Sequence, residues 1–157
     1  MITGLGVDIV EIGRMAIALK RHPAMRERLF SAEERAYCDK RNKPEIHYAL
    51  RFAAKEAVLK ALGTGFAGMK FTDVEVVRDA GGRPAPRLSG RAREVADELG
   101  IVELHLSLSY THTTAVASAV AITTPKDAEA TPDPEKRRAA AFKQARAVLD
   151  DLEPPIA

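Results

Sequence analysis

The chain has 157 residues, of which 46% are hydrophobic and 29% charged, and its formal net charge is +2. This length and balance are typical of one globular domain with a short appendage, and they exclude a disordered or fibrous chain. The longest apolar stretch, residues 115–122, is less than half of what a membrane-spanning helix needs.

Two features of the sequence bear on where the protein works. The first residues lack the basic start and the small-residue cleavage site of a signal peptide, so we expect a cytoplasmic protein. The single cysteine, Cys38, excludes an internal disulfide and agrees with a reducing compartment. No CxxC pair or His-Cys cluster indicates zinc.

The first predicted elements are a strand and a basic helix. Residues 2–12 are rich in Ile and Val, which predicts a strand with Asp8 near its end. A helix over residues 11–20 follows, and His22–Pro23 interrupts it because the residue before proline avoids helical geometry. The cations of residues 14–28 favour an acidic partner, although a solvated helix face explains them as well. They are Arg14, Lys20, Arg21, Arg26 and Arg28, and no nucleic-acid motif accompanies them.

The middle of the chain predicts two helices. Ser31 and Glu34 form an S-x-x-E capping box, which opens a helix that runs to about Arg41. Pro44 suits the first position of the next helix, in which apolar residues recur at helical spacing as far as residue 62. Two glycines then end this helix, which is the longest and which we expect to be central.

The second half alternates between strand and helix patterns. Residues 71–77 predict a strand, residues 80–84 a turn, and residues 91–99 a short helix. In residues 104–109 leucines alternate with polar residues, as in a half-buried strand. Residues 115–122 are the expected hairpin partner, with alanines on one face and larger side chains mostly on the other.

The composition changes after Thr124 to prolines and charged residues, which predict a linker, and residues 135–152 predict a charged helix. The expected fold class is therefore α+β. A single compact domain over residues 1–124 would pack a mainly antiparallel sheet against the long central helix. Residues 125–157 would form a linker and a C-terminal helical extension.

Two acidic residues are candidate ligands for a hard metal ion. Asp8 follows Gly6 near the end of a strand, where a helix cap or turn residue is the simpler interpretation. Glu56 and Lys60 lie four residues apart and so share a helix face, as in an ordinary surface ion pair. A carboxylate beside several cations on one rigid helix also suits a metal ion that carries a polyphosphate.

Hydroxyl side chains and an imidazole occur together near the last predicted hairpin. Ser107 and Ser109 lie on one face of the strand, and His112 follows in the turn. A Ser-His hydrolase is one hypothesis, but the G-x-S-x-G motif is missing and no motif provides an acidic partner.

Taken in order, these elements resemble the holo-acyl-carrier-protein synthase family of 4'-phosphopantetheinyl transferases. The shared pattern is G-x-D near the start, [FW]-x-x-K-E-A-x-x-K in the middle and S-x-S near the end, and F-S-x-x-E at residues 30–34 also fits. The resemblance covers about residues 1–123. The matching residues are Gly6, Asp8, Arg14, Phe52, Lys55, Glu56, Ala57, Lys60, Ser107 and Ser109.

The resemblance implies transfer of the phosphopantetheine arm of coenzyme A to a serine of an apo acyl carrier protein in fatty acid biosynthesis, with release of adenosine 3',5'-bisphosphate. It implies that Asp8 and Glu56 bind Mg²⁺ with the coenzyme A pyrophosphate, and that Lys60 contacts the phosphates; these three are the implied catalytic residues. The base is either Glu56 or a metal-bound water. Further coenzyme A contacts are implied for Arg51, Gly63, Thr64, Gly65, Ser109 and Tyr110.

The resemblance also implies partners. Arg14, Arg21 and Arg28 would face an acidic carrier protein, and short family members form homotrimers with the active site between neighbouring subunits. Many relatives have histidine where this chain has Tyr110, and here His112 follows two positions later. Two alternatives stay open, which are a carrier domain of a large type I synthase as the partner and a non-catalytic coenzyme A or nucleotide-binding module.

Overall fold

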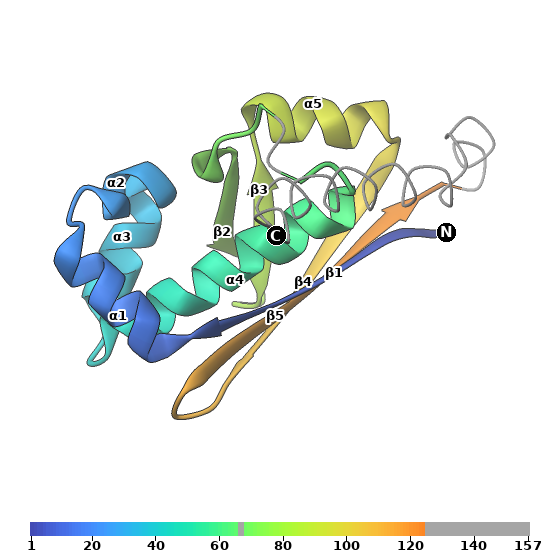
Figure 1. Cartoon of the computed structure of the whole chain (residues 1–157). Helices are drawn as coiled ribbons and strands as arrows, with labels where there is room; N and C mark the ends of the chain where they lie inside the picture. The colour runs from blue at the N-terminus through green and yellow to red at the C-terminus, as the bar shows by residue number, and fades with distance from the viewer. Residues whose placement is uncertain (66–67, 125–157) are drawn as a thin grey trace, which may run out of the picture.

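A long helix, α4 (Pro44–Leu62), lies along one face of a three-stranded antiparallel sheet (Figure 1). The strands are ordered β1 (Ile2–Glu11), β5 (Thr114–Thr123), β4 (Ile101–Tyr110). This computed structural model describes residues 1–65 and 68–124. The expected linker and C-terminal helix lie outside the described residues, while the expected α+β fold with a central helix is confirmed.

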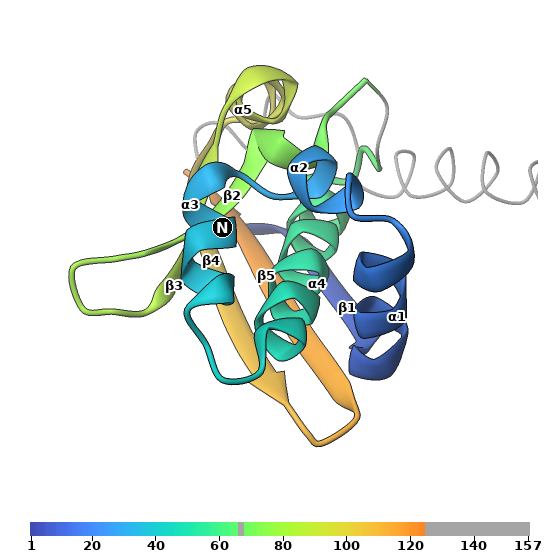
Figure 2. The ribbon, with the colours of Figure 1, turned by 90° about the vertical axis from the view of Figure 1, so that its left-hand side faces the viewer.

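The other described elements lie on the same side of this sheet as α4 (Figure 1). The helices α1 (Ile12–Arg21), α2 (Met25–Leu29) and α3 (Ala32–Asp39) gather at the end where α4 begins. A 3₁₀ turn, η1 (Phe71–Asp73), leads into a two-stranded sheet of β2 (Val74–Arg78) and β3 (Pro84–Leu88), whose turn extends away from the body (Figure 2). The helix α5 (Gly90–Glu98) precedes β4. None of the helices in the described ranges has the length and apolarity to span a membrane.

Small side chains line the interface between α4 and the sheet. On β5, every second residue from Ala115 to Ala121 is an alanine with no exposed surface, as the alternation in the sequence predicts. Ala53 and Ala57 of α4 are equally buried. With so little side chain between them, the helix and the sheet approach closely.

Two glycines of β1 bring α4 even nearer. A Cβ atom added at Gly4 would lie 1.9 Å from the carbonyl oxygen of Ala61, and one added at Gly6 would lie 1.8 Å from that of Ala57. Both obstacles are helix backbone, which no side-chain rotation can move. Only glycine fits at these positions, so they fix where β1 crosses α4.

The opposite face of the sheet has no described element over it (Figure 1). Its β1 side is apolar, because Leu5, Val7 and Ile9 point outward and each keeps more than half of its surface exposed. Val116 and Val120 of β5 continue this surface, since they pair with Ile9 and Leu5. An apolar surface of this kind on a folded chain typically marks an interaction site.

The sequence did not predict three of the elements, of which the first is η1, where residues 71–73 form a 3₁₀ turn in place of the start of the predicted strand. The five-residue α2 follows Pro23 and has too few residues for a helical period to appear in the sequence. Strand β3 contains Pro84 and Pro86, which argue against a strand, yet proline is tolerated on an edge strand such as this one. The capping box of Ser31 and Glu34 is confirmed.

Candidate active site

Asp8 points toward α4, because it lies on the same face of β1 as Gly4 and Gly6. Lys60 of α4 donates one hydrogen bond to Asp8 Oδ1 at 2.8 Å and another to the carbonyl oxygen of Val7 at 2.9 Å. The expected surface ion pair between Lys60 and Glu56 was therefore wrong, because the ammonium group of Lys60 pairs with Asp8 on the strand. The Asp8 side chain is 17% exposed, whereas that of Lys60 is 51% exposed and open to solvent.

Glu56 lies one helical turn before Lys60 and is half buried. Burial raises the pKa of its carboxyl group above the ordinary value, the negative charge of Asp8 raises it further, and Lys60 opposes both effects. The two carboxylates that the sequence placed far apart therefore repel each other through space. The structure brings Asp8, Glu56 and Lys60 together at the crossing of β1 and α4.

The raised pKa of Glu56 predicts a pH-dependent stability of the metal-free protein. A carboxyl group whose pKa is higher in the folded than in the unfolded chain stabilises the fold at low pH, and this contribution is lost as pH rises through the folded-state pKa. The free energy of unfolding should fall from about pH 4.5, the ordinary value, upward. Denaturant titrations at several pH values, compared with Glu56→Gln, measure this contribution, and equal slopes in both proteins would contradict it.

The donor atoms at this crossing fit a magnesium ion. Two carboxylates that repel each other gain from a shared divalent cation, and Mg²⁺ prefers oxygen ligands in an octahedron completed by phosphates and water. Among the described residues no cluster of three or more His, Cys, Asp or Glu provides a fuller set of protein ligands.

The turn after α4 continues along the helix from Glu56 and Lys60. Gly63 ends the helix in the left-handed conformation with φ 71°, which favours glycine, and its N–H donates to the carbonyl oxygens of Leu59 and Lys60. Thr64 Oγ1 is buried and has no hydrogen-bond partner in the described part of the chain. An unpaired buried hydroxyl is costly, so this atom is a candidate contact for a polar ligand.

Arg51 lies apart from this crossing. Five residues before Glu56, it leaves α4 in a direction rotated by roughly 140°. Its guanidinium carbon lies 3.9 Å from the centre of the Tyr37 ring, and its buried Nε has no hydrogen-bond partner among the described residues. Arg41, in the turn between α3 and α4, and Arg78 of β2 also lie over this ring, so three arginines gather around Tyr37.

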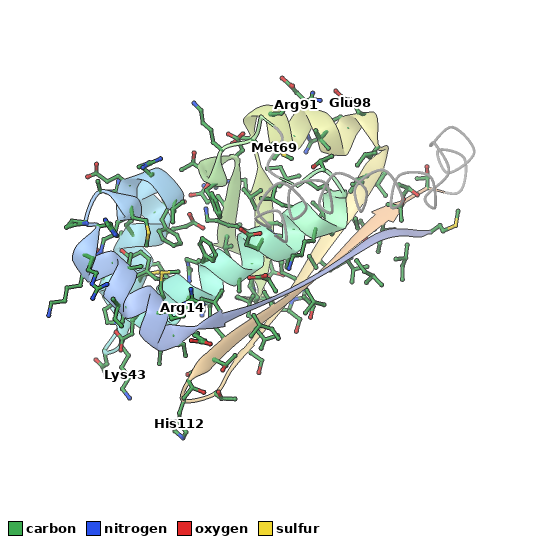
Figure 3. The ribbon with its side chains drawn as sticks, viewed as in Figure 1. Arg14, Lys43, Met69, Arg91, Glu98 and His112 are labelled. Atoms are coloured by element: carbon green, nitrogen blue, oxygen red, sulfur yellow. The ribbon has the colours of Figure 1, made fainter. Side chains whose placement is uncertain are left out.

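Ser109 and Tyr110 also lie away from the crossing, and on opposite faces of the sheet. Ser109 pairs with Val116 on the uncovered face, whereas Tyr110 pairs with Ala115 on the helix-covered face near the end of the hairpin. His112 lies exposed at the hairpin tip (Figure 3). One chain therefore does not unite Asp8 and Glu56 with these three side chains, and within residues 1–65 and 68–124 no hydrogen bond joins Ser109 to His112.

The arginines expected to face a carrier protein are exposed. Arg14 and Arg21 lie on α1 and Arg28 on α2, and Figure 3 shows Arg14 on α1 at the end of the molecule where α4 begins. None of the three forms an ion pair within the described residues, so their charges are available to an acidic surface.

Sequence reasoning missed one buried cluster beside the site. Lys55 immediately precedes Glu56 but is completely buried, and it forms an ion pair with the equally buried Glu34 at 2.8 Å. Two neighbouring charged residues on a helix usually indicate an exposed face. The sequence feature that points to the buried pair is Glu34, because its place in the capping box fixes the direction of its side chain.

Comparisons with known proteins agree on one family. Residues 4–120 match the family model described as the 4'-phosphopantetheinyl transferase superfamily. The chain is 48% identical over 103 residues to the holo-[acyl-carrier-protein] synthase of Moorella thermoacetica, which covers 66% of this chain and 80% of that protein. The crystal structure of the synthase from Neisseria meningitidis superimposes with a TM-score of 0.71 at 36% identity, over 78% of this chain and 100% of that one. The Helicobacter pylori synthase in complex with coenzyme A gives 0.66 at 31% identity, over 75% and 99%.

Proposed function

The chain belongs to the 4'-phosphopantetheinyl transferase superfamily, and we propose on that basis that Asp8, Glu56 and Lys60 form its active centre. The chain is a transferase that moves the 4'-phosphopantetheine group of coenzyme A to an apo acyl carrier protein. We assign it to fatty acid biosynthesis in the cytoplasm and its transferase unit to residues 1–124. The observation that supports this centre is the electrostatic interaction of the two carboxylates and the ammonium group where β1 crosses α4.

In this proposal Asp8 and Glu56 hold Mg²⁺. When bound, the ion supplies charge neutralisation to the pyrophosphate of coenzyme A. Lys60 is half exposed, so its ammonium group can turn from Asp8 to a phosphate oxygen. The Gly63–Gly65 turn allows a close approach of backbone to the ligand, with Thr64 Oγ1 as a further donor.

The nucleophile belongs to the carrier protein, whose serine hydroxyl attacks the β-phosphorus and releases adenosine 3',5'-bisphosphate. This chain therefore acts by positioning its substrates and neutralising charge, which are the main contributions to catalysis of phosphoryl transfer. The serine proton must go to a base. Glu56 and a water molecule are the two proposed acceptors.

Incubation with coenzyme A, Mg²⁺ and an apo carrier protein, followed by mass spectrometry of the carrier, tests this function. We expect the mass of one phosphopantetheine group to be added and the addition to stop in the presence of a chelator. An unmodified carrier with tightly bound coenzyme A would instead support a non-catalytic binding module. Parallel assays with a free-standing carrier and with a type I carrier domain decide between these two partners.

We propose that the carrier docks on the basic surface of α1 and α2, where Arg14, Arg21 and Arg28 are exposed. Arg14→Glu should therefore raise KM for the carrier protein at least about tenfold, because a reversed charge repels an acidic partner. The KM for coenzyme A should hardly change. Steady-state kinetics with each substrate varied in turn measure both values, and equal effects on the two would contradict docking at Arg14.

We further propose that the chain forms a trimer through the uncovered face of the sheet. The apolar surface of Leu5, Val7 and Ile9 supports this proposal. The second support is that Arg51 and Ser109 point away from Glu56 within one chain. If they contact coenzyme A, they do so at the carboxylate pair of a neighbouring subunit.

The variant Leu5→Asp/Ile9→Asp tests the trimer. Charges placed on an apolar contact surface lose their hydration on association, so we expect monomers by size-exclusion chromatography with light scattering. Activity should fall with the loss of the trimer. The control is Ile17→Asp, an equally exposed apolar residue on α1, which should stay trimeric. A parent protein that is monomeric and fully active would exclude a shared site.

A further inference from the structure

Lys55 precedes the proposed metal ligand Glu56 but lies about 100° around α4 from it and points into the protein. Its ammonium group is fully buried and uses all three of its donors. It donates to Glu34 Oε2 at 2.8 Å, to the carbonyl oxygen of Val74 at 2.6 Å and to that of Phe71 at 3.1 Å. One side chain of α4 is thus bonded to α3, to η1 and to the start of β2.

Glu34 is satisfied to the same degree. Besides Lys55, its carboxylate accepts hydrogen bonds from the backbone N–H of Ser31 at 3.0 Å and from that of Val76 at 2.9 Å. Every polar group of the buried pair therefore has a partner of defined direction. The Lys55–Glu34 pair therefore joins α4 to α3, η1 and β2.

Stability alone does not account for these two charges. Removing two charges from water costs several kcal/mol each, and replacing a buried ion pair with apolar residues of similar size is often neutral or stabilising. In some proteins a buried, directional pair specifies one arrangement of the elements that carry it.

The interface between α4 and the three-stranded sheet needs such a constraint. Alanines and glycines form most of it, and Gly4 and Gly6 of β1 meet helix backbone rather than interdigitating side chains. The two glycines set where β1 crosses α4, but an interface of small side chains offers few interlocking contacts against rotation of the helix about its axis. A small rotation of α4 would carry Glu56 away from Asp8.

We propose that Lys55 and Glu34 are positioning residues that fix the rotation of α4 about its axis, and so hold Glu56 opposite Asp8. The inference rests on the proposed function of Asp8 and Glu56. Neither Lys55 nor Glu34 touches the substrates in this proposal; they act through the helix that carries Glu56.

The test compares Lys55→Met/Glu34→Leu with the parent protein. Three quantities are measured, which are the thermal midpoint, the dissociation constant of Mn²⁺ in the absence of coenzyme A and carrier by electron paramagnetic resonance, and kcat. We expect a folded variant whose Mn²⁺ dissociation constant rises about 10- to 100-fold, as for other residues that support metal ligands, and whose kcat falls by a similar factor. The thermal midpoint should stay within a few degrees of the parent.

The control is Arg91→Met/Glu98→Leu, which removes an exposed ion pair on the outer side of α5, away from α4 (Figure 3). It should bind Mn²⁺ like the parent. If the first variant does not fold, Lys55→Met/Glu34→Gln carries the same test, because it keeps one side-chain oxygen that accepts from either the Ser31 or the Val76 amide. A folded variant of either kind with parental Mn²⁺ affinity and kcat overturns the inference. If Glu56→Gln also leaves Mn²⁺ affinity and activity unchanged, the proposed function itself fails.

Discussion

Glu56→Gln should lower kcat/KM by about 10²- to 10³-fold while the chain stays folded. The amide is nearly the same size as the carboxylate but cannot neutralise a divalent cation or accept a proton. The loss of one ligand at a metal that stabilises phosphoryl charge corresponds to several kcal/mol of barrier, which is two or three factors of ten. Mass spectrometric assays of carrier modification across a Mg²⁺ titration measure the effect.

Asp8→Asn should have a similar effect, and the double variant should be little worse than either single one. Residues that act as a unit have strongly non-additive effects, since removing one already disables the other. Glu98→Gln, an exposed carboxylate of α5, is the matched control and should retain parental activity. Full activity of Glu56→Gln at saturating Mg²⁺ would show that the ion is held elsewhere.

The metal-free Glu56→Gln protein should be at least as stable as the parent. In the parent, the pKa of the Glu56 carboxyl group is raised, so its charged form is disfavoured in the folded state at neutral pH. An active-site group that destabilises its own fold while increasing activity is a common trade-off. A variant that is inactive and less stable would instead indicate a structural role.

Elements governed by local rules were predictable from the sequence. The capping box of Ser31 and Glu34 gave the start of α3, and Pro44 and Gly63 gave both ends of α4. The alternation in residues 115–122 gave the buried face of β5. Each of these signals depends on neighbours within a few residues, so no tertiary information was needed.

Features that depend on contacts between distant segments were not predictable. Lys55 and Glu34 are charged residues, which are almost never fully buried without a partner, and no sequence rule named that partner. The ion pair of Lys60 with Asp8 was missed for the same reason, because helical spacing favoured Glu56. The pairing of Asp8 with Glu56 came from the family resemblance and not from the spacing of residues.

The spacing of small residues in the sequence also indicates where the site lies. Gly4 and Gly6 lie two apart on a strand, while Ala57 and Ala61 lie four apart on a helix, so each pair occupies one face of its element. Such matched small residues indicate backbone-to-backbone contact. They would have placed Asp8, the next residue on the same strand face, against α4.

Gly6→Ala should be the most damaging single-methyl change in the chain. The added Cβ would lie 1.8 Å from the carbonyl oxygen of Ala57, so β1 and α4 must separate. Overpacking of this kind typically costs about 1–3 kcal/mol of stability, and rigid backbone on both sides favours the upper end. Denaturant unfolding measures this cost directly.

Activity should fall further than stability explains. Asp8 lies two residues from Gly6 on the same strand face, and a displacement of about 1 Å at a reacting centre can cost roughly 100-fold in rate. Gly13→Ala is the matched control, because nothing lies within 4 Å of its added Cβ in helix α1. It should leave activity unchanged and raise stability by up to about 1 kcal/mol, as alanine favours helix over glycine. If Gly6→Ala remained as stable and active as Gly13→Ala, close contact between β1 and α4 would not be what holds Asp8 beside Glu56.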